Sequence, residues 1–407
     1  MRYTEMNIEK PILDAILELG FKETTEIQEK AIPLVKAGKD VMGQSETGSG
    51  KTAAFGLPIL EKVKQKAGIQ ALIVAPTREL AEQISKNLKS FSKNKKFFIT
   101  TVYGGVSLNP QIEYLKIAEI VVGTPGRILD HLRRGTLHLE KVKFLVLDEA
   151  DRMFDMGFID DIKQIISLCP KDRQTLLFSA TLNSQVQKIA ERYMRDPERI
   201  KTKDFVKKEL LKQIYYDVPR GEKFSLLVHL IQTEKPQLAL VFCSTRREVD
   251  IISRNLYENG VKAMAMHGGL SQDKRNRVME SFRNQHINIL VASDVAARGL
   301  DINDLTHIFN YSIPKNSKEY IHRIGRTARM GKAGVAINLL DEADYQNFNA
   351  VLNDHSIKVE QMEVPSFKKL FVKKFVQRGV DRGFHRPTDW RRPAYRSQGS
   401  RPRFYQH

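Results

Sequence analysis

Residues 45–52, which read SETGSGKT, have the residue types and spacing of a phosphate-binding loop. Its two glycines allow the backbone to turn, so that several N–H groups and the start of the following helix point at phosphates. Lys51 can reach the β and γ phosphates, and the Thr52 hydroxyl can bind Mg²⁺. The pattern therefore predicts a triphosphate site formed by Ser45, Glu46, Thr47, Gly48, Ser49, Gly50, Lys51 and Thr52.

An acidic tetrapeptide follows an apolar run later in the same half of the chain. Residues 142–147, VKFLVL, are typical of a buried strand, and residues 148–151 begin at its carboxyl end, where α/β sheets place ligands. We expect Asp148 to hold Mg²⁺ through its water shell and Glu149 to orient and deprotonate an attacking water. The alternative, an acidic helix start without chemistry, is disfavoured because a phosphate loop precedes it in the same domain.

The same tetrapeptide recurs at residues 341–344, after another apolar run. Its half of the chain contains no phosphate loop, so we interpret this copy as a solvated helix start. The placement of the four residues, rather than their identity, therefore carries the prediction.

Short β-rich runs alternate with helical stretches through most of the chain, which is the pattern of parallel sheets built from βαβ units. In the first half the expected strands are Ala71 to Ala75, Phe98 to Tyr103, Ile117 to Val122, Phe144 to Leu147 and Thr175 to Phe178. In the second half they are Leu238 to Cys243, Val261 to Met266, Ile287 to Ala292, His307 to Asn310 and Val335 to Leu339. The sequence thus predicts two similar α/β domains in succession.

The boundaries follow from composition. The stretch from Lys201 to Lys212 is lysine-rich and poor in strand signals, which indicates a flexible linker at 204–210. We expect a first domain at 1–203, a second at 211–365 and a basic, largely disordered tail at 366–407.

The bulk composition indicates a polyanionic partner. The 407 residues carry 66 Lys and Arg against 48 Asp and Glu, a net charge of +18. No apolar run approaches the roughly 18 residues needed to cross a bilayer, and the first residues are not a signal peptide, so no membrane association and a cytoplasmic protein are expected. The two cysteines, Cys169 and Cys243, have no neighbours of a metal site or a disulfide framework and are expected in the core.

The expected tail combines basic and aromatic residues. Its twelve Lys and Arg against two Asp give a local net charge of +10. The spacing of Phe367, Leu370, Phe371 and Phe375 predicts a helix that packs on the second domain. Beyond it, arginines alternate with aromatic side chains, which favours nonspecific RNA anchoring. A solubilising tail and a membrane-surface helix are the alternatives.

With its phosphate loop and its acidic tetrapeptide at 148–151, the chain resembles the DEAD-box RNA helicases of helicase superfamily 2. The resemblance covers about residues 1–365. The resemblance implies two tandem RecA-like domains, each a mainly parallel sheet flanked by helices. It also implies a Q motif that reads adenine, in which Gln28 faces the base edge and Tyr3 stacks on the base. Thr24 stands where the family usually has proline. The Q motif residues are Tyr3, Phe21, Thr25 and Gln28.

The resemblance also assigns the remaining motifs of the first domain. Ser179 and Thr181 would link the ATP state to RNA by hydrogen bonds toward Asp151. The RNA motifs supply hydroxyls, arginines and bare backbone N–H groups, which suit sugar and phosphate and predict sequence-independent binding. They are Pro76, Thr77, Arg78, Gly104, Gly105, Thr124, Gly126 and Arg127.

The second domain is expected to complete the site of the first, because it lacks a phosphate loop. By the resemblance, Arg326 and Arg329 are arginine fingers aimed at the γ-phosphate, and Asp301 faces the ATP ribose. Ser293, Ala328 and Ser312 replace a usual threonine, glycine and aspartate. The expected RNA residues are Thr245, Arg246, Gln272, Arg275, Ser293 and Gly299.

Together these features predict a monomeric ATPase that uses ATP and Mg²⁺, binds single-stranded RNA or short duplexes, and works with ribonucleoprotein or ribosome-assembly partners. Domain closure on ATP and RNA would open a few base pairs without translocation. A DNA-directed superfamily 2 motor is one alternative, although it normally differs at the Q motif and the acidic tetrapeptide. The other is a nonenzymatic, ATP-gated RNA clamp that acts as an assembly platform.

Overall fold

The first sheet is built from short runs rich in Val, Ile and Leu, because strands covered by helices on both faces are apolar along their length. Its seven strands are all parallel, in the order β3-β4-β2-β5-β6-β1-β7. The strands are β1 Val41–Gln44, β2 Ala71–Val74, β3 Ile99–Val102, β4 Ile120–Gly123, β5 Phe144–Leu147, β6 Gln174–Ser179 and β7 Glu198–Lys201. The helices are η1 Tyr3–Glu5, α1 Lys10–Glu18, α2 Glu26–Lys36, α3 Lys51–Lys62, α4 Arg78–Phe91, α5 Asn109–Leu115, α6 Pro125–Arg133, α7 Ala150–Asp155, α8 Ile159–Leu168 and α9 Ser184–Tyr193.

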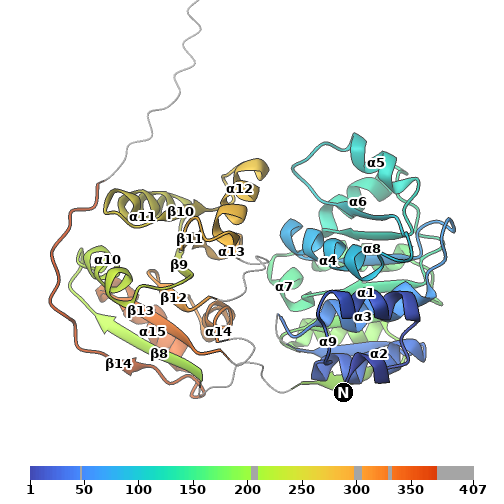
Figure 1. The fold of residues 1–407 in the computed structure, drawn as a ribbon, viewed down its shortest axis with the longest axis horizontal. Helices are drawn as coiled ribbons and strands as arrows, with labels where there is room; N and C mark the ends of the chain where they lie inside the picture. Colours follow the sequence, from blue (N-terminus) through green and yellow to red (C-terminus); the bar gives the residue numbers. More distant parts are fainter. Residues whose placement is uncertain (46–47, 203–209, 298–304, 329–331, 374–407) are drawn as a thin grey trace, which may run out of the picture. The chain divides into compact units, whose positions relative to one another are not determined.

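The second sheet repeats this arrangement, again with seven parallel strands, in the order β10-β11-β9-β12-β13-β8-β14. The strands are β8 Leu211–Asp217, β9 Ala239–Cys243, β10 Ala263–Met266, β11 Ile289–Ser293, β12 His307–Asn310, β13 Gly334–Leu340 and β14 Glu360–Gln361. The helices are α10 Lys223–Glu234, α11 Arg246–Glu258, α12 Gln272–Arg283, α13 Asp294–Ala297, α14 Ser317–Ile324, η3 Glu342–Asp344 and α15 Tyr345–Leu352. Figure 1 shows the elements of each domain.

This computed structural model describes residues 1–45, 48–202, 210–297, 305–328 and 332–373. Most of the predicted linker and tail therefore lies outside the described residues. So do the predicted site residues Glu46, Thr47, Gly299, Asp301 and Arg329. Within the described ranges no helix has the length and apolar character needed to cross a bilayer.

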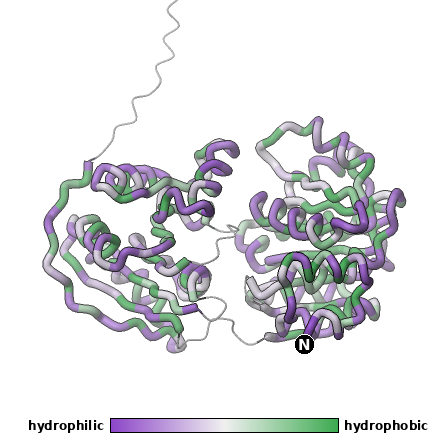
Figure 2. Tube along the Cα trace, in the orientation of Figure 1, coloured by the Kyte–Doolittle hydropathy of each residue, from purple (hydrophilic) through white to green (hydrophobic). Residues whose placement is uncertain are grey.

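Each sheet has a core on both faces, because successive side chains of a strand point to opposite sides. In β2, Ile73 packs into one core of the first domain, while Leu72 and Val74 pack into the other. Figure 2 shows hydrophobic residues along the interior of both domains and many hydrophilic residues on the surrounding helices. Cys169 and Cys243 are both buried, as expected.

The prediction of two α/β domains with mainly parallel sheets is confirmed, and the ten expected strands all form within a few residues of their expected bounds. Four further strands were not anticipated: β1, β7, β8 and β14. β1 is short and contains Gly43, while β7 and β14 have mostly polar side chains at or near a sheet edge. None of these has the run of apolar residues that reveals a buried strand.

The helix expected from the spacing of Phe367 and Leu370 is wrong over 366–373, where the chain has no helix. This segment instead crosses α10 as extended chain. The Ser225 hydroxyl accepts a hydrogen bond from the Leu370 N–H at 2.9 Å, and Phe367 packs near His229 with ring centroids 6.3 Å apart. Phe367, Leu370 and Val372 pack against the core of the second domain in this arrangement, whereas Phe371 is 94% exposed.

Candidate functional site

The phosphate loop connects β1 to α3, and two glycines and Lys51 set its conformation. Gly50, with φ of 90°, is the residue before α3, and Gly48 also has a left-handed φ of 88°. Lys51 is buried and donates to the Ser45 carbonyl at 3.1 Å, so its ammonium lies over the loop. The sequence pattern thus forms the predicted turn at the start of a helix, where N–H groups and the helix dipole favour phosphate.

Sheet order brings the acidic residues beside this loop. Asp148 and Glu149 follow β5, and β5 is separated from β1 only by β6. β6 ends at Ser179, whose carbonyl accepts from the Ser45 N–H at 3.0 Å and whose hydroxyl accepts from the Asp151 N–H at 3.2 Å. The end of β6 therefore ties the phosphate loop to the acidic segment.

The two acidic side chains have opposite electrostatic character although they are adjacent. Burial raises the pKa of Asp148 to about 6, against the opposing effect of the Lys51 charge. Burial would also raise the pKa of Glu149, but the charges of Arg152 and Lys51 outweigh it and lower that pKa to about 2. Glu149 therefore stays ionised, as a base that orients water must.

Glu149 owes its ionisation mainly to a neighbour within the same helical turn. Arg152 Nη1 lies 2.5 Å from Glu149 Oε2, and each side chain is only 7% exposed. Glu149 also has a left-handed backbone, with φ of 52°, which is uncommon for a residue with a side chain. Such strained residues are enriched at functional sites.

Asp148 and Thr52 have the donors that Mg²⁺ prefers. The ion binds carboxylate and hydroxyl oxygens, and it usually takes one or two protein ligands together with phosphate oxygens and water. The described residues contain no group of three His, Cys, Asp or Glu side chains that could enclose a metal. Because burial raises the pKa of Asp148, a nearby cation would stabilise the ionised form of its carboxylate.

The Q motif residues gather against the phosphate loop. Gln28 Oε1 accepts from the Tyr3 hydroxyl at 2.6 Å and from the Thr25 N–H at 2.9 Å, and its Nε2 donates to the Gly50 carbonyl at 3.1 Å. Thr25 Oγ1 donates to the Ser49 carbonyl at 2.7 Å. These bonds leave no space beside Gly50, where an added Cβ would lie 2.2 Å from Gln28 Nε2.

The two aromatic residues assigned to adenine differ in access. The Tyr3 ring is 2% exposed, so stacking on a base would require it to leave its present position. Phe21 is 47% exposed and packs edge-on against Phe91. Stacking by Tyr3 stays a prediction. In the structure the Tyr3 hydroxyl donates to the Gln28 amide and so orients it.

The Asp151 carboxylate joins the acidic segment to residues 179–181, Ser-Ala-Thr, at the end of β6. Its Oδ2 accepts from the Thr181 N–H at 2.9 Å and from the Thr181 hydroxyl at 2.8 Å. The Ser179 hydroxyl donates to the Thr181 carbonyl at 2.8 Å. Two short bonds to one buried carboxylate oxygen fix Thr181 relative to the ATP residues.

The RNA motifs of the first domain lie at the other half of the same sheet edge. They follow β2, β3 and β4, which are neighbours in the sheet. Arg78 reaches the loop after β3, since a Cβ on Gly105 would lie 2.2 Å from its Nη2. Arg127 donates to the Val106 carbonyl at 3.3 Å, and Thr77 caps α4. One edge thus carries the predicted ATP residues after β5, β6 and β1 and the predicted RNA residues after β2, β3 and β4.

The second sheet groups its motifs in the same way. Thr245 caps α11 after β9, Arg246 lies beside Gly268 after β10, and Ser293 ends β11. These three strands are neighbours, and Gln272 and Arg275 lie on α12, which follows β10. The predicted RNA residues of this domain that the structure describes therefore lie along one part of one edge.

The segment that carries the predicted arginine finger Arg326 begins within α14, which also contains Arg323. Arg323 is 3% exposed and pairs with both carboxylate oxygens of Asp294, at 2.6 and 2.7 Å. Its Nη1 also donates to the Ser312 carbonyl at 2.6 Å. Arg326 is buried, at 8% exposed, and Ala328 has a left-handed φ of 54°, where a glycine would be unstrained.

The tetrapeptide at 341–344 is a helix start, as expected, but it is not fully solvated. Asp341 caps η3, and Asp344 is 9% exposed and pairs with the buried Lys223 at 2.5 Å. Burial beside a lysine thus corrects the expectation of a solvated segment.

Sequence patterns did not assign Arg152, Arg323 or Asp294. The i,i+3 spacing of Glu149 and Arg152 is a signal that could have indicated their contact. The pairing of Arg323 with Asp294 joins residues 29 positions apart, and only the tertiary structure brings them together.

This fold and site define a protein of two tandem RecA-like domains with a phosphate loop in the first. The pattern of the DEAD/DEAH box helicase family matches residues 25–189, and that of the helicase conserved C-terminal domain matches residues 222–331. The chain therefore belongs to the DEAD-box helicases, an ATP-hydrolysing enzyme family.

Known relatives are similar over most of the chain. The ATP-dependent RNA helicase CshA of Listeria monocytogenes is 46% identical over 374 residues, which are 91% of this chain and 72% of the relative. A crystal structure of a DEAD box protein from the hyperthermophile Methanococcus jannaschii is 43% identical, with a TM-score of 0.55 over 89% of this chain and 99% of that one. Dbp5 of S. cerevisiae, bound to RNA and ADP BeF3, is 31% identical, with a TM-score of 0.80 over 89% and 95%.

Proposed function

We propose that this protein is an ATP-dependent RNA helicase in which RNA stimulates hydrolysis and closure of the two domains opens short duplexes locally. The observation that carries this proposal is the strand order, which gathers the predicted ATP residues at one half of a sheet edge and the predicted RNA residues at the other. Ser179, Thr181 and Asp151 connect the phosphate loop to the acidic segment by hydrogen bonds. In this proposal, RNA bound at the neighbouring strand ends acts on this connection when the domains close.

In this mechanism Lys51 holds the β and γ phosphates, and Glu149 accepts the proton of the attacking water. Mg²⁺, held by Asp148 and Thr52, would neutralise charge on the phosphate oxygens. Gln28, Thr25 and Phe21 would select adenine. Hydrolysis waits for arginines of the second domain, because a finger of this kind contributes roughly 10³ to 10⁵ in rate.

RNA binding would be sequence-independent, through sugar and phosphate contacts. Arg78, Arg127 and Arg246 supply charge at the two sheet edges, and threonine caps supply hydroxyls. We further propose a cytoplasmic monomer whose basic segment beyond residue 373 anchors RNA, with ribonucleoprotein or ribosome-assembly complexes as targets. A relative solved with RNA and ADP BeF3 supports RNA as the polymer.

The test compares ATP hydrolysis by the full chain alone, with single-stranded RNA and with DNA of the same sequence. We expect strong stimulation by RNA, little by DNA, and ATP-dependent separation of a duplex of about ten base pairs. Glu149→Gln should bind ATP and RNA but turn over slowly, and Arg326→Ala should lose RNA-stimulated turnover. Hydrolysis at full rate without RNA would contradict the proposal, and ATP-dependent RNA retention without any duplex separation would indicate a clamp instead.

A further inference from the structure

The first sheet ends at β3, and the outer edge of this strand is open. The Phe98 carbonyl accepts from the Glu119 N–H at 3.0 Å, and the Val102 carbonyl accepts from the Thr124 N–H at 3.0 Å, so these residues face β4. The backbone groups of Ile99 and Thr101 point the opposite way, because successive residues of a strand alternate in direction. Among the described residues, neither makes a backbone hydrogen bond outside the sheet.

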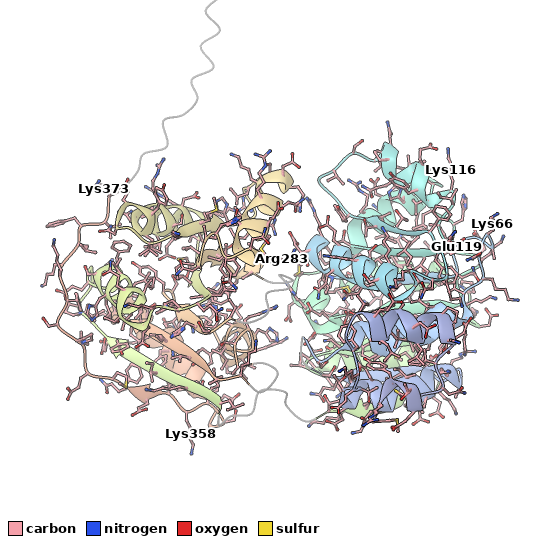
Figure 3. The ribbon with its side chains drawn as sticks, viewed as in Figure 1. Lys66, Lys116, Glu119, Arg283, Lys358 and Lys373 are labelled. Carbon is pink, nitrogen blue, oxygen red and sulfur yellow. The ribbon has the colours of Figure 1, made fainter. Side chains whose placement is uncertain are left out.

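A groove of about 730 Å³ runs along this edge, within the roughly 300–1,000 Å³ of ligand sites. Its floor is the stretch 97–101, and one wall comes from α5 and the loop before it. A second hollow of about 480 Å³ shares Lys89, Thr101 and Tyr103 with it and continues along α4. The start of the strand is held in place by Glu119, whose Oε2 accepts from the Phe98 N–H at 2.7 Å. Figure 3 labels Glu119 beside Lys66, whose N–H it also accepts.

Exposed apolar side chains surround the groove. Phe98 is 54% exposed, Tyr114 60%, Ile117 49% and Val106 37%. All four line the same hollow, although large apolar residues are normally scattered singly on a surface. A cluster of this kind indicates a surface that binds apolar side chains.

The charged residues that line the α4 side are Lys86, Lys89 and Glu82, which sum to a charge of +1. Lys86 and Lys89 are both exposed, and neither forms an ion pair in the part of the chain that the structure describes. Glu82 accepts a hydrogen bond from the Tyr103 hydroxyl and keeps its negative charge, so the two lysines leave an excess of one positive charge. Two lysines without carboxylate partners favour an acidic ligand.

We propose that this groove binds an extended segment of a partner protein, which pairs with β3 as an additional strand. The segment carries apolar side chains for Phe98 and Tyr114 and a carboxylate for Lys86 and Lys89. Strand addition of this kind takes its affinity from backbone hydrogen bonds and its specificity from alternate side chains. The groove lies along the strand and extends to Tyr103 and Val106, on either side of the predicted RNA residues Gly104 and Gly105.

An RNA strand fits this edge less well than a peptide. The outward groups of Ile99 and Thr101 include carbonyls as well as N–H groups. A phosphate offers only acceptors and would leave those carbonyls without a donor, which is costly where water is displaced. A second polypeptide backbone supplies both donors and acceptors at the spacing of a sheet.

The probe is a fluorescein-labelled octapeptide, Asp-Val-Thr-Val-Thr-Val-Thr-Asp, amidated at its carboxyl end. Its binding to the full chain is measured by anisotropy. The same peptide N-methylated at alternate residues keeps its side chains but cannot pair, and a version with lysines in place of the aspartates tests charge. Thr101→Pro removes one outward N–H without breaking a bond to β4, and Thr101→Ala is its matched control.

We expect N-methylation and Thr101→Pro each to weaken binding at least roughly tenfold, a change of about 1.4 kcal/mol, while Thr101→Ala stays close to the parent. The lysine peptide should bind less tightly than the aspartate peptide, and the variant Lys86→Glu with Lys89→Glu should reverse that order. Amide hydrogen exchange at Ile99 and Thr101 should slow when peptide binds. ATP hydrolysis by Thr101→Pro should remain, which shows that the variant is folded.

The proposal is overturned if N-methylation and Thr101→Pro leave peptide affinity unchanged, or if no peptide binds at millimolar concentration. It is also overturned if oligouridylate rather than peptide protects the amides of Ile99 and Thr101. If the amides of Ile99 and Thr101 are already protected without peptide, and this protection disappears when residues 374–407 are removed, the groove is assigned to this chain's own tail. If protection of the Ile99 amide without peptide depends on protein concentration and is lost in Thr101→Pro, the groove is assigned to a second copy of the chain.

Discussion

Replacing Arg152 by methionine removes the cation that faces Glu149 but keeps most of the apolar stem. Both side chains of this pair are 7% exposed, so water cannot replace the lost charge. Breaking a buried pair by removing one partner typically costs about 3–5 kcal/mol, because the other charge stays buried. We therefore expect Arg152→Met to destabilise the first domain by that amount.

The lowered pKa of Glu149 points in the same direction, and Lys51 and Arg326 contribute to it together with Arg152. A value of about 2, against an ordinary 4.5, corresponds to about 3 kcal/mol of stability from its ionised form. Because the folded-state pKa is lowered, this contribution is present above pH 4.5 and is lost as the pH falls toward 2. The parent and Arg152→Met should therefore approach equal stability in acid.

The assay is calorimetric unfolding of the full chain without nucleotide, at neutral pH. For a domain of 150–250 residues, 1 kcal/mol shifts the Tm by about 2–4 °C, so we expect a shift of roughly 6–20 °C. Lys163→Met is the matched control, because Lys163 forms an i,i+3 pair with Asp160 that is exposed and should contribute under about 1 kcal/mol. The reasoning is refuted if both variants shift the Tm equally, or if Glu149→Gln and Arg152→Met add to within about 0.5 kcal/mol in the double variant.

Three further changes test other parts of the site. Gly50→Ala introduces a Cβ 2.2 Å from Gln28 Nε2 at a φ of 90°, so ATP affinity should fall by at least roughly tenfold in a fluorescent-nucleotide titration; unchanged affinity would contradict this packing. Thr181→Val removes one of the two bonds to Asp151 Oδ2, about 1.5–3 kcal/mol, and should reduce duplex separation more than ATP hydrolysis; equal losses in the two assays would argue against a coupling role. Ala328→Gly relieves a left-handed backbone and should raise stability in urea unfolding by about 0.5–1 kcal/mol, whereas a loss would show that the methyl group matters more.

Local patterns were sufficient for the elements that carry chemistry. The phosphate loop, the strand before Asp148 and the threonine caps of α4 and α11 depend on neighbours in sequence. Glycine spacing, an apolar run and a cap residue act within a few positions, so they are visible without a fold. The alternation of strands and helices likewise predicted two parallel sheets, because each buried strand is apolar by itself.

What the sequence could not determine depends on contacts between distant residues. Polar β7 and the two-residue β14 become strands because a neighbouring strand offers hydrogen bonds, and Phe367 packs on α10 rather than forming a helix. The burial of Tyr3 against Gln28 and the open edge of β3 are likewise consequences of packing. The sequence by itself thus determined which chemical groups this protein has and which strands deliver them. Only the tertiary structure decided strand order, and with it which predicted ATP residues and which predicted RNA residues are neighbours, because that order depends on which apolar faces pack together.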